Sequence, residues 1–204
     1  MNTTMIGIVD YGAGNHRSVT SAVHSLGYRT RMIRSAEDIS GIDLLLLPGV
    51  GAFVTAMSEI RALGLDQVLR QWAYEGKPLL GICLGMQMLA DVSYEHGTTR
   101  GLELIPGKVQ PLTTPDWHIG WNRLEITEQG QSFLKPCYGQ DFYFNHSFEF
   151  NTSDTYVIAT SRLSRPLVAA VKRDNVCGLQ FHPEKSQAAG KNILKITIDE
   201  LLYA

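Results

Sequence analysis

Cysteine is scarce in this sequence, and the three cysteines form no recognisable pattern. Cys83, Cys137 and Cys177 are an odd number, which argues against a disulfide framework. Their spacing also matches no zinc-binding pattern. We therefore expect a reduced, cytoplasmic protein that carries no structural metal ion.

Long apolar runs and blocks of one charge are also missing. No stretch approaches the ~18 consecutive apolar residues of a membrane span, and residues 1–10 lack the basic region of a secretory signal. The 18 Lys and Arg residues are scattered among 20 Asp and Glu residues, so neither nucleic acid nor an anionic membrane is an expected partner. A chain of 204 residues, 44% of them hydrophobic, suits one α/β domain and is too short for two. Residues 1–204 are predicted to be a single domain.

The first half of the chain alternates short apolar runs with helical patterns. Four consecutive leucines in 42–47 indicate a strand buried on both faces, as in a parallel sheet. Val19, Ala22, Val23 and Leu26 recur at helical spacing, and Gly27 is placed to end that helix. This alternation predicts right-handed βαβ units. Strands are expected at 5–9, 29–33, 42–47 and 78–82, with a helix or helix pair around 65–72 and a further helix from 84 to about 92.

The second half has the pattern of strands linked by turns. Asp174-Asn175 is the expected tip of a hairpin, and Ile193, Ile196 and Leu201 are apolar positions of a terminal helix. The predicted fold class is α/β, with a central, mostly parallel sheet flanked by helices and extended by antiparallel strands. Strands are expected within residues 104–112, 118–127, 142–150, 155–162 and 166–181.

The segment Gly81-Ile-Cys83-Leu-Gly85 connects a predicted buried strand directly to a predicted helix. This is the cysteine version of the nucleophile elbow, a tight turn that presents the nucleophile above the sheet. The glycines permit the turn, and the helix N-terminus favours the reactive thiolate. The alternative, a buried and inert cysteine, is the common fate of free cysteines. We adopt it for Cys137 and Cys177, which have no such setting.

The segment Gln180-Phe-His182-Pro-Glu184 supplies a base and a carboxylate that could orient it. In extended backbone, residues two apart project to the same side. Glu184 can therefore hold one imidazole nitrogen of His182 while the other faces the thiol, as a nucleophile with a base requires. Alone, a His-Pro-Glu tripeptide is more often a surface turn, but together with the elbow it indicates a catalytic triad.

Acyl transfer also needs backbone N–H donors where the oxyanion develops. The amide of Leu84, directly after the nucleophile, can supply one donor. Residues 47–53, Leu-Pro-Gly-Val-Gly-Ala-Phe, follow a strand and contain glycines that could turn a second amide toward the same point. Without the other two motifs, this segment would be interpreted as an ordinary turn at the end of a strand.

Together, these three motifs resemble those of the class I (triad) glutamine amidotransferases. The resemblance implies that Cys83 is the nucleophile, His182 the general base and then acid, and Glu184 the orienting carboxylate. It also implies an oxyanion hole made by the backbones of Val50 and Leu84, and no cofactor. The residues that it assigns to glutamine binding are Gly49, Gly51, Gln87 and Ser147.

Three further segments narrow the resemblance to the glutaminase subunits of imidazole glycerol phosphate synthases, from histidine biosynthesis. They are Asp10–Asn15, His118–Asn122 and Tyr143–Ser147. The resemblance implies a heterodimer with a (β/α)₈-barrel cyclase, which uses the ammonia to convert PRFAR to imidazole glycerol phosphate and AICAR. The segments depart from the usual pattern at Trp117, Asn145 and Phe148.

The same resemblance places Asn15, Trp121, Tyr143 and Lys185 at or near the interface with the cyclase. Each of these residues also has a purely structural alternative. Asn15 could cap a helix, Trp121 and Tyr143 could be core aromatics, and Lys185 could be a solvated side chain.

Three other functions remain open at this level. The chain could be the glutaminase subunit of an anthranilate or aminodeoxychorismate type of amidotransferase, although the segments 10–15 and 118–122 argue against this. It could be a stand-alone cysteine hydrolase of γ-glutamyl bonds, which would need no partner. It could also be a binding module that lost its chemistry, although all three triad residues are present.

Overall fold

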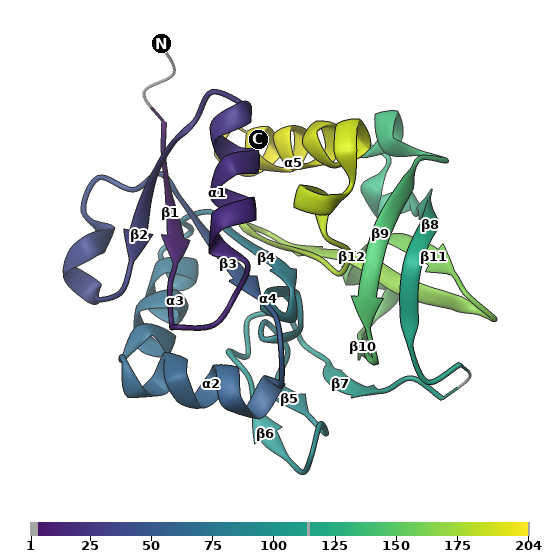
Figure 1. Ribbon diagram of the computed structural model, residues 1–204, viewed down its shortest axis with the longest axis horizontal. Helices are drawn as coiled ribbons and strands as arrows, with labels where there is room; N and C mark the ends of the chain where they lie inside the picture. Colours follow the sequence, from purple (N-terminus) through teal and green to yellow (C-terminus); the bar gives the residue numbers. More distant parts are fainter. Residues whose placement is uncertain (1–3, 114, 204) are drawn as a thin grey trace.

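The computed structural model describes residues 4–113 and 115–203, and its centre is a nine-stranded mixed sheet (Figure 1). The strand order is β2-β1-β3-β4-β13-β12-β11-β8-β9. The five strands from β2 to β13 run parallel, and from β13 onward each neighbour is antiparallel. The strands are β1 (Met5–Val9), β2 (Arg29–Ile33), β3 (Leu44–Gly49), β4 (Leu79–Cys83), β8 (His118–Ile126), β9 (Asp141–His146), β11 (Val157–Arg162), β12 (Pro166–Arg173) and β13 (Val176–Leu179).

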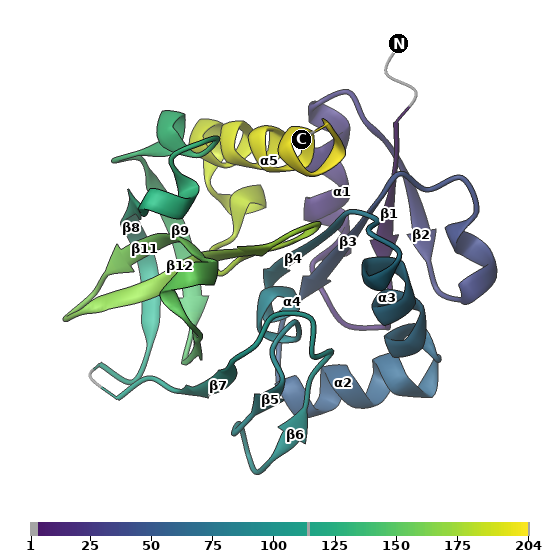
Figure 2. The same ribbon diagram turned by 180° about the vertical axis from the view of Figure 1, so that it is seen from behind.

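Helices cover both faces of the parallel part of this sheet. In Figures 1 and 2, α1 (His16–Ser25) and α5 (Gln187–Tyr203) lie along one face, and α2 (Phe53–Ala62) and α3 (Leu65–Tyr74) lie along the other. The predicted fold class is therefore confirmed. Short 3₁₀ turns complete the connections: η1 (Ala36–Ile39), η2 (Glu128–Gly130), η3 (Lys135–Cys137), η4 (Asp154–Tyr156) and η5 (Pro183–Lys185).

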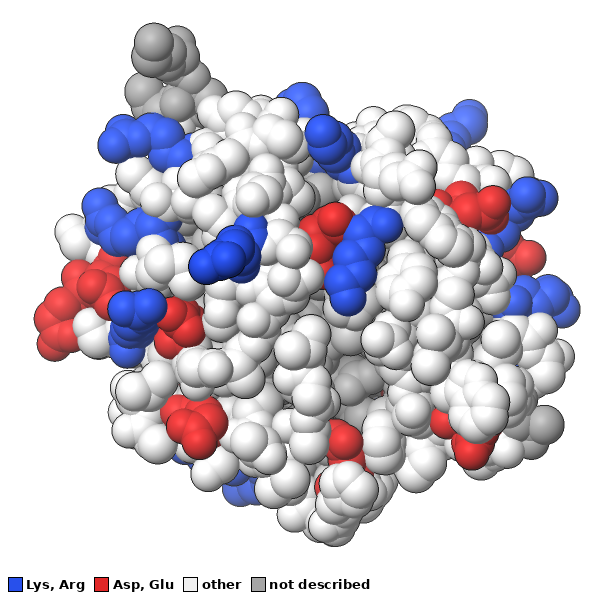
Figure 3. All heavy atoms as spheres, viewed as in Figure 1, with Lys and Arg blue, Asp and Glu red and all other residues white. Residues whose placement is uncertain are grey.

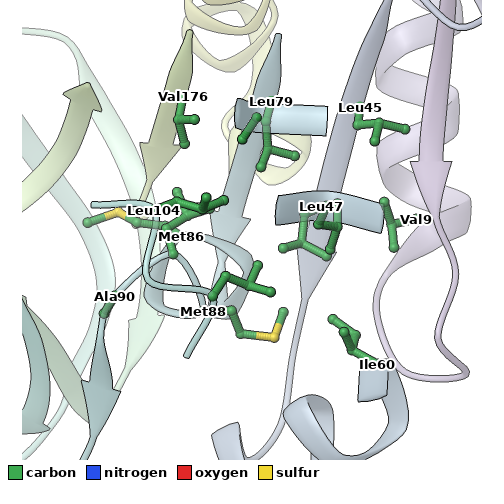
Figure 4. Close-up of a cluster of buried hydrophobic side chains, with 14 of the residues drawn as sticks. Val9, Leu45, Leu47, Ile60, Leu79, Met86, Met88, Ala90, Leu104 and Val176 are labelled. Carbon is green, nitrogen blue, oxygen red and sulfur yellow. The ribbon is translucent and has the colours of Figure 1, made fainter. Parts of the chain in front are cut away.

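The leucine run of β3 explains why the sheet needs a helical layer on each side. Leu44 and Leu46 belong to the core beneath α1 and α5, whereas Leu45 and Leu47 belong to the core beneath α2 and α3. Figure 4 shows part of the second core, where Leu45 and Leu47 lie between side chains of neighbouring strands and of α2. Burial on both faces was the prediction made from these four residues, and it is confirmed.

The helix predicted from residue 84 to about 92 is much shorter in the structure. Helix α4 spans only Leu84–Gln87. The carbonyls of Met88, Leu89 and Ala90 accept hydrogen bonds from backbone amides of residues 102–105, which come back alongside this segment. The chain therefore pairs with this later loop instead of continuing the helix, a competition between distant segments that local periodicity does not reveal.

Two predicted strands are divided or shortened by a second, four-stranded sheet of order β10-β7-β5-β6. The strand expected at 142–150 breaks at Ser147, because β9 belongs to the large sheet and the following strand to the small one. The strand expected at 104–112 is limited to the part that pairs in this small sheet. Its members are β5 (Val92–Ser93), β6 (Thr99–Arg100), β7 (Lys108–Pro111) and β10 (Phe148–Asn151), of which β5 and β6 were not predicted.

Other predicted elements agree closely with the structure. The strand predicted at 166–181 is a hairpin of β12 and β13 with its tip at Asp174-Asn175. Within residues 4–113 and 115–203, no helix is both long enough and apolar enough to cross a membrane. On the face shown in Figure 3, basic and acidic side chains are interspersed with uncharged ones, in line with the net charge of −2.

Candidate active site

Cys83 occupies a strained turn between β4 and α4. Its φ of 55° and ψ of −113° lie in a region that residues with a side chain rarely adopt. The turn depends on close backbone contacts at Gly85, where a Cβ atom would come within 1.8 Å of the Leu47 carbonyl oxygen. At Gly81 a Cβ atom would come within 2.6 Å of the Gly85 carbonyl oxygen. The sequence and the backbone together have the geometry of a nucleophile elbow.

His182 lies beside Cys83 because their strands are neighbours in the sheet. Strands β4 and β13 are parallel, with Leu179 opposite Ile82, so their carboxyl ends meet at one edge. The His182 side chain is hydrogen-bonded to Cys83 and to Glu184. This arrangement brings together two side chains that are nearly a hundred residues apart in the sequence.

Glu184 holds the other nitrogen of the imidazole. His182 Nδ1 donates to Glu184 Oε1 at 2.9 Å, and the two side chains are only 3% and 2% exposed. The His182 backbone is fixed as well: its amide donates to the carbonyl of Tyr143 at 2.8 Å, and its carbonyl accepts from the Ser186 hydroxyl at 2.7 Å. The ring is therefore held from both sides, with Nε2 left to face the sulfur.

The environment of His182 favours its protonated form. Burial by itself lowers the pKa of His182, but the hydrogen bonds with Cys83 and Glu184 and their negative charges outweigh it and raise the pKa to about 9. Protonated His182 next to the sulfur can therefore act as the proton donor for a leaving group near neutral pH.

The two other cysteines have no such environment. Cys137 and Cys177 are fully buried, and burial raises the pKa of the first to about 11 and of the second to about 12. Both are therefore protonated, unreactive core residues near neutral pH. The structural interpretation of these two residues is confirmed.

A cavity of about 280 Å³ opens above the sulfur, a size that suits a small metabolite. Gly49 does not line it; it pairs with Cys83 across β3 and β4 and packs against the elbow, where a Cβ atom would meet the Gly85 amide nitrogen at 2.8 Å. The other residues expected at the oxyanion hole or around glutamine all line the cavity. The full lining is Val50, Gly51, Cys83, Leu84, Gln87, Glu95, Asn145, His146, Ser147, Phe148, His182 and Lys185.

Three polar residues of this region, Glu95, Gln180 and His146, were not predicted as site residues from the sequence. Glu95 is 7% exposed, lies in the turn between β5 and β6, and accepts a hydrogen bond from the Phe53 amide at 2.7 Å. No local pattern marks it, because the two flanking strands are only two residues long. Gln180 donates toward Cys83 Sγ at 4.0 Å, and its position two residues before His182 could have indicated this. His146 lines the cavity beside Ser147.

Of the four residues predicted at a partner interface, Asn15 contacts Glu184 and Tyr143 lies beside His182, whereas Trp121 reaches the triad only through Tyr143. The Trp121 ring makes an edge-on contact with Tyr143 at 6.1 Å, and Lys185 Nζ lies 5.8 Å from the centre of the Tyr143 ring. Trp121 is 50% exposed, so it is not a core aromatic. The Asn15 side chain makes no cap hydrogen bond and instead donates to Glu184 Oε1 at 3.4 Å. The core alternative for Trp121 is therefore wrong. Asn15 does occupy the N-cap position of α1, but its side chain makes no capping hydrogen bond there.

Three positions, Trp117, Asn145 and Phe148, depart from the usual pattern of the glutaminase subunits, and they lie in different settings. Trp117 is 56% exposed, just before β8. Asn145 and Phe148 line the cavity, and the carbonyl of Phe148 accepts a hydrogen bond from Gln87 Nε2 at 3.0 Å. These departures leave the triad geometry intact.

Comparison with known proteins places this site in a family. Residues 7–200 match the family model described as glutamine amidotransferase class-I. Among solved structures, a glutamine amidotransferase superposes with a TM-score of 0.76 at 22% identity, covering 98% of this chain and 99% of the other. PurLQS from Thermotoga maritima gives 0.75 at 19% identity, covering 98% and 100%. Identities this low show a shared fold.

Curated relatives are considerably more similar. Imidazole glycerol phosphate synthase subunit HisH from Listeria monocytogenes serotype 4a (strain HCC23) is 43% identical over 94% of this chain and 93% of its own length. The protein of the same name from Lacticaseibacillus casei (strain BL23) is 44% identical over 97% and 99%. The chain therefore belongs to the class-I glutamine amidotransferases, and within them to the HisH subunits of imidazole glycerol phosphate synthase.

Proposed function

We propose that this chain, as one amidotransferase domain of residues 1–204, hydrolyses glutamine to glutamate and ammonia and delivers the ammonia to a separate cyclase subunit. The buried triad carries the proposal: a cysteine on a strained elbow is hydrogen-bonded to His182, which is held by Glu184, at the base of a small polar cavity. The names of the relatives support an assignment to imidazole glycerol phosphate synthase.

In the first chemical step, the Cys83 thiolate attacks the side-chain amide carbon of glutamine. A carbon–sulfur bond forms, and the carbonyl electrons move to oxygen to give a tetrahedral oxyanion. Collapse of this intermediate breaks the carbon–nitrogen bond as His182 Nε2 gives its proton to the leaving nitrogen. The products are ammonia and a γ-glutamyl thioester on Cys83.

In the second step, water replaces ammonia. Neutral His182 takes a proton from water as the oxygen attacks the thioester carbon, and the carbon–sulfur bond breaks to regenerate the thiolate. Glu184 stabilises the imidazolium in both steps, since its carboxylate is the acceptor for Nδ1–H. Neither of these two reaction steps involves a redox change or a metal ion.

The cavity lining suits a zwitterionic amino acid. Glu95 is an anionic acceptor for the α-ammonium group, while Gln87 and Ser147 provide polar atoms for the remainder of the substrate. Gly51 has a φ of 95°, so the Val50–Gly51 peptide lies in a segment that tolerates unusual backbone conformations. In this proposal the amides of Val50 and Leu84 bind the oxyanion.

Reorientation of the Val50 amide is the proposed control of activity. Without a partner and its substrate, the Val50 amide is turned away from the oxyanion, and one missing donor costs on the order of 10²–10³ in rate. The partner is a (β/α)₈-barrel cyclase that forms a cytoplasmic heterodimer with this chain, and PRFAR is its substrate. Asn15, Trp121, Tyr143 and Lys185 form its docking surface next to the triad. A sheltered passage between the subunits follows, because ammonia released into water is protonated and no longer nucleophilic.

The test is glutamine hydrolysis by the chain alone, with the cyclase, and with the cyclase plus PRFAR. We expect slow turnover alone, strong activation by the complete system, and formation of imidazole glycerol phosphate and AICAR. Cys83→Ala should abolish glutamate release while leaving complex formation intact. Equal turnover with and without the partner would instead favour a stand-alone hydrolase.

A further inference from the structure

The polar residues of the cavity wall continue into a hydrogen-bonded chain that reaches the outer strands of the sheet. Its first part joins two buried histidines. His118 on β8 is 2% exposed and His146 on β9 is 8% exposed, and the two residues are paired across these strands. His118 Nδ1 and His146 Nε2 are 3.1 Å apart, and His118 also stacks on the Phe144 ring with centroids 4.2 Å apart.

Backbone groups fix the direction of every bond at the outer end of this chain. The Asn122 Oδ1 atom accepts from the Arg123 amide at 2.8 Å, and Asn122 Nδ2 donates to the Arg162 carbonyl at 2.8 Å. The amide orientation of Asn122 is thus determined by groups that have only one possible role. The second hydrogen of Asn122 Nδ2 points to His118 Nε2 at 3.2 Å, so this ring nitrogen is an acceptor.

The inner end is fixed in the same way. His146 Nδ1 lies 2.8 Å from the carbonyl oxygen of Phe148, which can only accept. Nδ1 of His146 must therefore carry a hydrogen, and its Nε2 accepts from His118 Nδ1–H. Both rings are neutral and hold their proton on Nδ1. Burial supports this state, because it lowers the pKa of His118 to about 4, and burial is also the main reason that the pKa of His146 falls to about 4.

The Phe148 carbonyl connects the histidines to the nucleophile. The same oxygen accepts from Gln87 Nε2 at 3.0 Å, and Gln87 Nε2 also donates to Gln180 Oε1 at 3.0 Å. This leaves Gln180 Nε2 facing Cys83 Sγ at 4.0 Å. The chain therefore passes from β8 to the sulfur with one consistent set of donors and acceptors.

We propose that His118 and His146 are positioning residues, which fix the Phe148 carbonyl and with it the Gln87 side chain in the wall of the glutamine cavity. The inference rests on the proposed glutaminase function. His118 does not line the cavity, so it acts on the substrate only through His146. Without the His118 Nδ1–H donor, His146 Nε2 has no hydrogen-bond partner. The side chains of the cavity wall are then no longer held in one arrangement.

Two substitutions of His118 separate this role from simple packing. His118→Phe keeps a ring to stack on Phe144 and removes both nitrogens. His118→Asn loses the ring but keeps an N–H donor near the position of Nδ1. His24→Phe is the matched control. His24 lies on α1 and is hydrogen-bonded to the Thr30 hydroxyl, so it takes no part in the hydrogen-bonded chain from His118 to Cys83.

The assay is glutamine hydrolysis by the complex with the cyclase and PRFAR, with thermal unfolding to verify that each variant is folded. We expect His118→Phe to raise the KM for glutamine about tenfold, the scale of one lost hydrogen bond. His118→Asn should restore the KM to within about threefold of wild type by the same accounting. Alkylation of Cys83 by iodoacetamide, which has no α-amino or α-carboxyl group, should stay within about twofold in both variants.

Three results would overturn the proposal: an unchanged KM in His118→Phe, a loss that His118→Asn does not restore, or an equal loss in the alkylation rate. A separate test uses the unmodified protein, in which long-range ¹H–¹⁵N spectra at neutral pH should show His118 and His146 as Nδ1–H tautomers. An Nε2–H tautomer in either ring would contradict the proposed direction of these hydrogen bonds. If the wild-type protein released no ammonia from glutamine, the proposed glutaminase function itself would be rejected. Normal turnover in all His118 variants would instead reject only the positioning role.

Discussion

Replacement of Glu184 by glutamine tests how much the buried carboxylate contributes to His182. The pKa of His182 rises from 6.5 to about 9 although burial opposes the rise. At ~1.4 kcal/mol per pKa unit, this net rise corresponds to about 3 kcal/mol in favour of the imidazolium. Cys83 and Glu184 share this contribution. Because burial remains after the charge is removed, we expect Glu184→Gln to lower the pKa of His182 by at least about one unit.

The consequence for catalysis is a slower enzyme with a displaced pH profile. Glutamine cannot stabilise the imidazolium as a carboxylate does, so kcat should fall about 10²- to 10⁴-fold. In wild type, the alkaline limb of kcat/KM should lie near pH 9, where His182 loses its proton. In Glu184→Gln this limb should move to lower pH. The assay is glutamate release between pH 5 and 10 in the complex with the cyclase and PRFAR.

The same change has a signature in stability. The pKa of His182 is higher in the folded state than in the unfolded chain, so protonated His182 stabilises the fold. This contribution is complete below about pH 6.5 and is lost as the pH rises through about 9. In Glu184→Gln, urea unfolding should therefore show a smaller stability loss over this window. Glu75→Gln, at an exposed ion pair with Lys77, is the control. A Glu184→Gln variant with the wild-type rate and alkaline limb would refute the reasoning.

Further predictions concern the elbow, the outer surface and the hairpin. Gly85→Ala places a Cβ atom 1.8 Å from the Leu47 carbonyl oxygen and should cost at least about 4 kcal/mol or prevent folding, whereas Gly76→Ala, with open space and a φ of 74°, should cost about 1–2 kcal/mol in urea unfolding. Trp121→Ala should leave unfolding within about 0.5 kcal/mol of wild type, because the side chain is half exposed, and should weaken cyclase binding about tenfold or more in calorimetry. Asn175→Ala removes two side-chain hydrogen bonds to backbone carbonyls and should lower the free energy of unfolding by about 1–3 kcal/mol; a wild-type unfolding midpoint would contradict this role for the hairpin tip.

Local patterns in the sequence were sufficient to predict those elements whose structure depends mainly on residues within the element itself. The leucines of β3 required burial on both faces, and the structure places helices on both. The elbow around Cys83 was recognisable because a strand, two glycines and a nucleophile occur at fixed spacing. His182 and Glu184 were identifiable because residues two apart in extended backbone share a side.

Where distant segments compete for the same backbone groups, the local pattern failed. The apolar residues after α4 have helical spacing, yet the carbonyls of Met88 to Ala90 are used by the segment that returns at 102–105. The strand expected at 142–150 has a continuous apolar pattern, but it divides at Ser147 between two sheets. Neither outcome is encoded in the residues of the segment alone.

The sequence by itself determined the class of fold and the family, and it predicted Cys83, His182 and Glu184 as a triad, because each depends on residue type and short spacing. Only the tertiary structure placed Glu95 in the cavity and joined His118, His146, Gln87 and Gln180 into one hydrogen-bonded chain. The physical reason is that a hydrogen bond depends on the distance and direction between two groups. For groups on different strands, both are set by the pairing and register of the sheet rather than by the residues next to them in the chain.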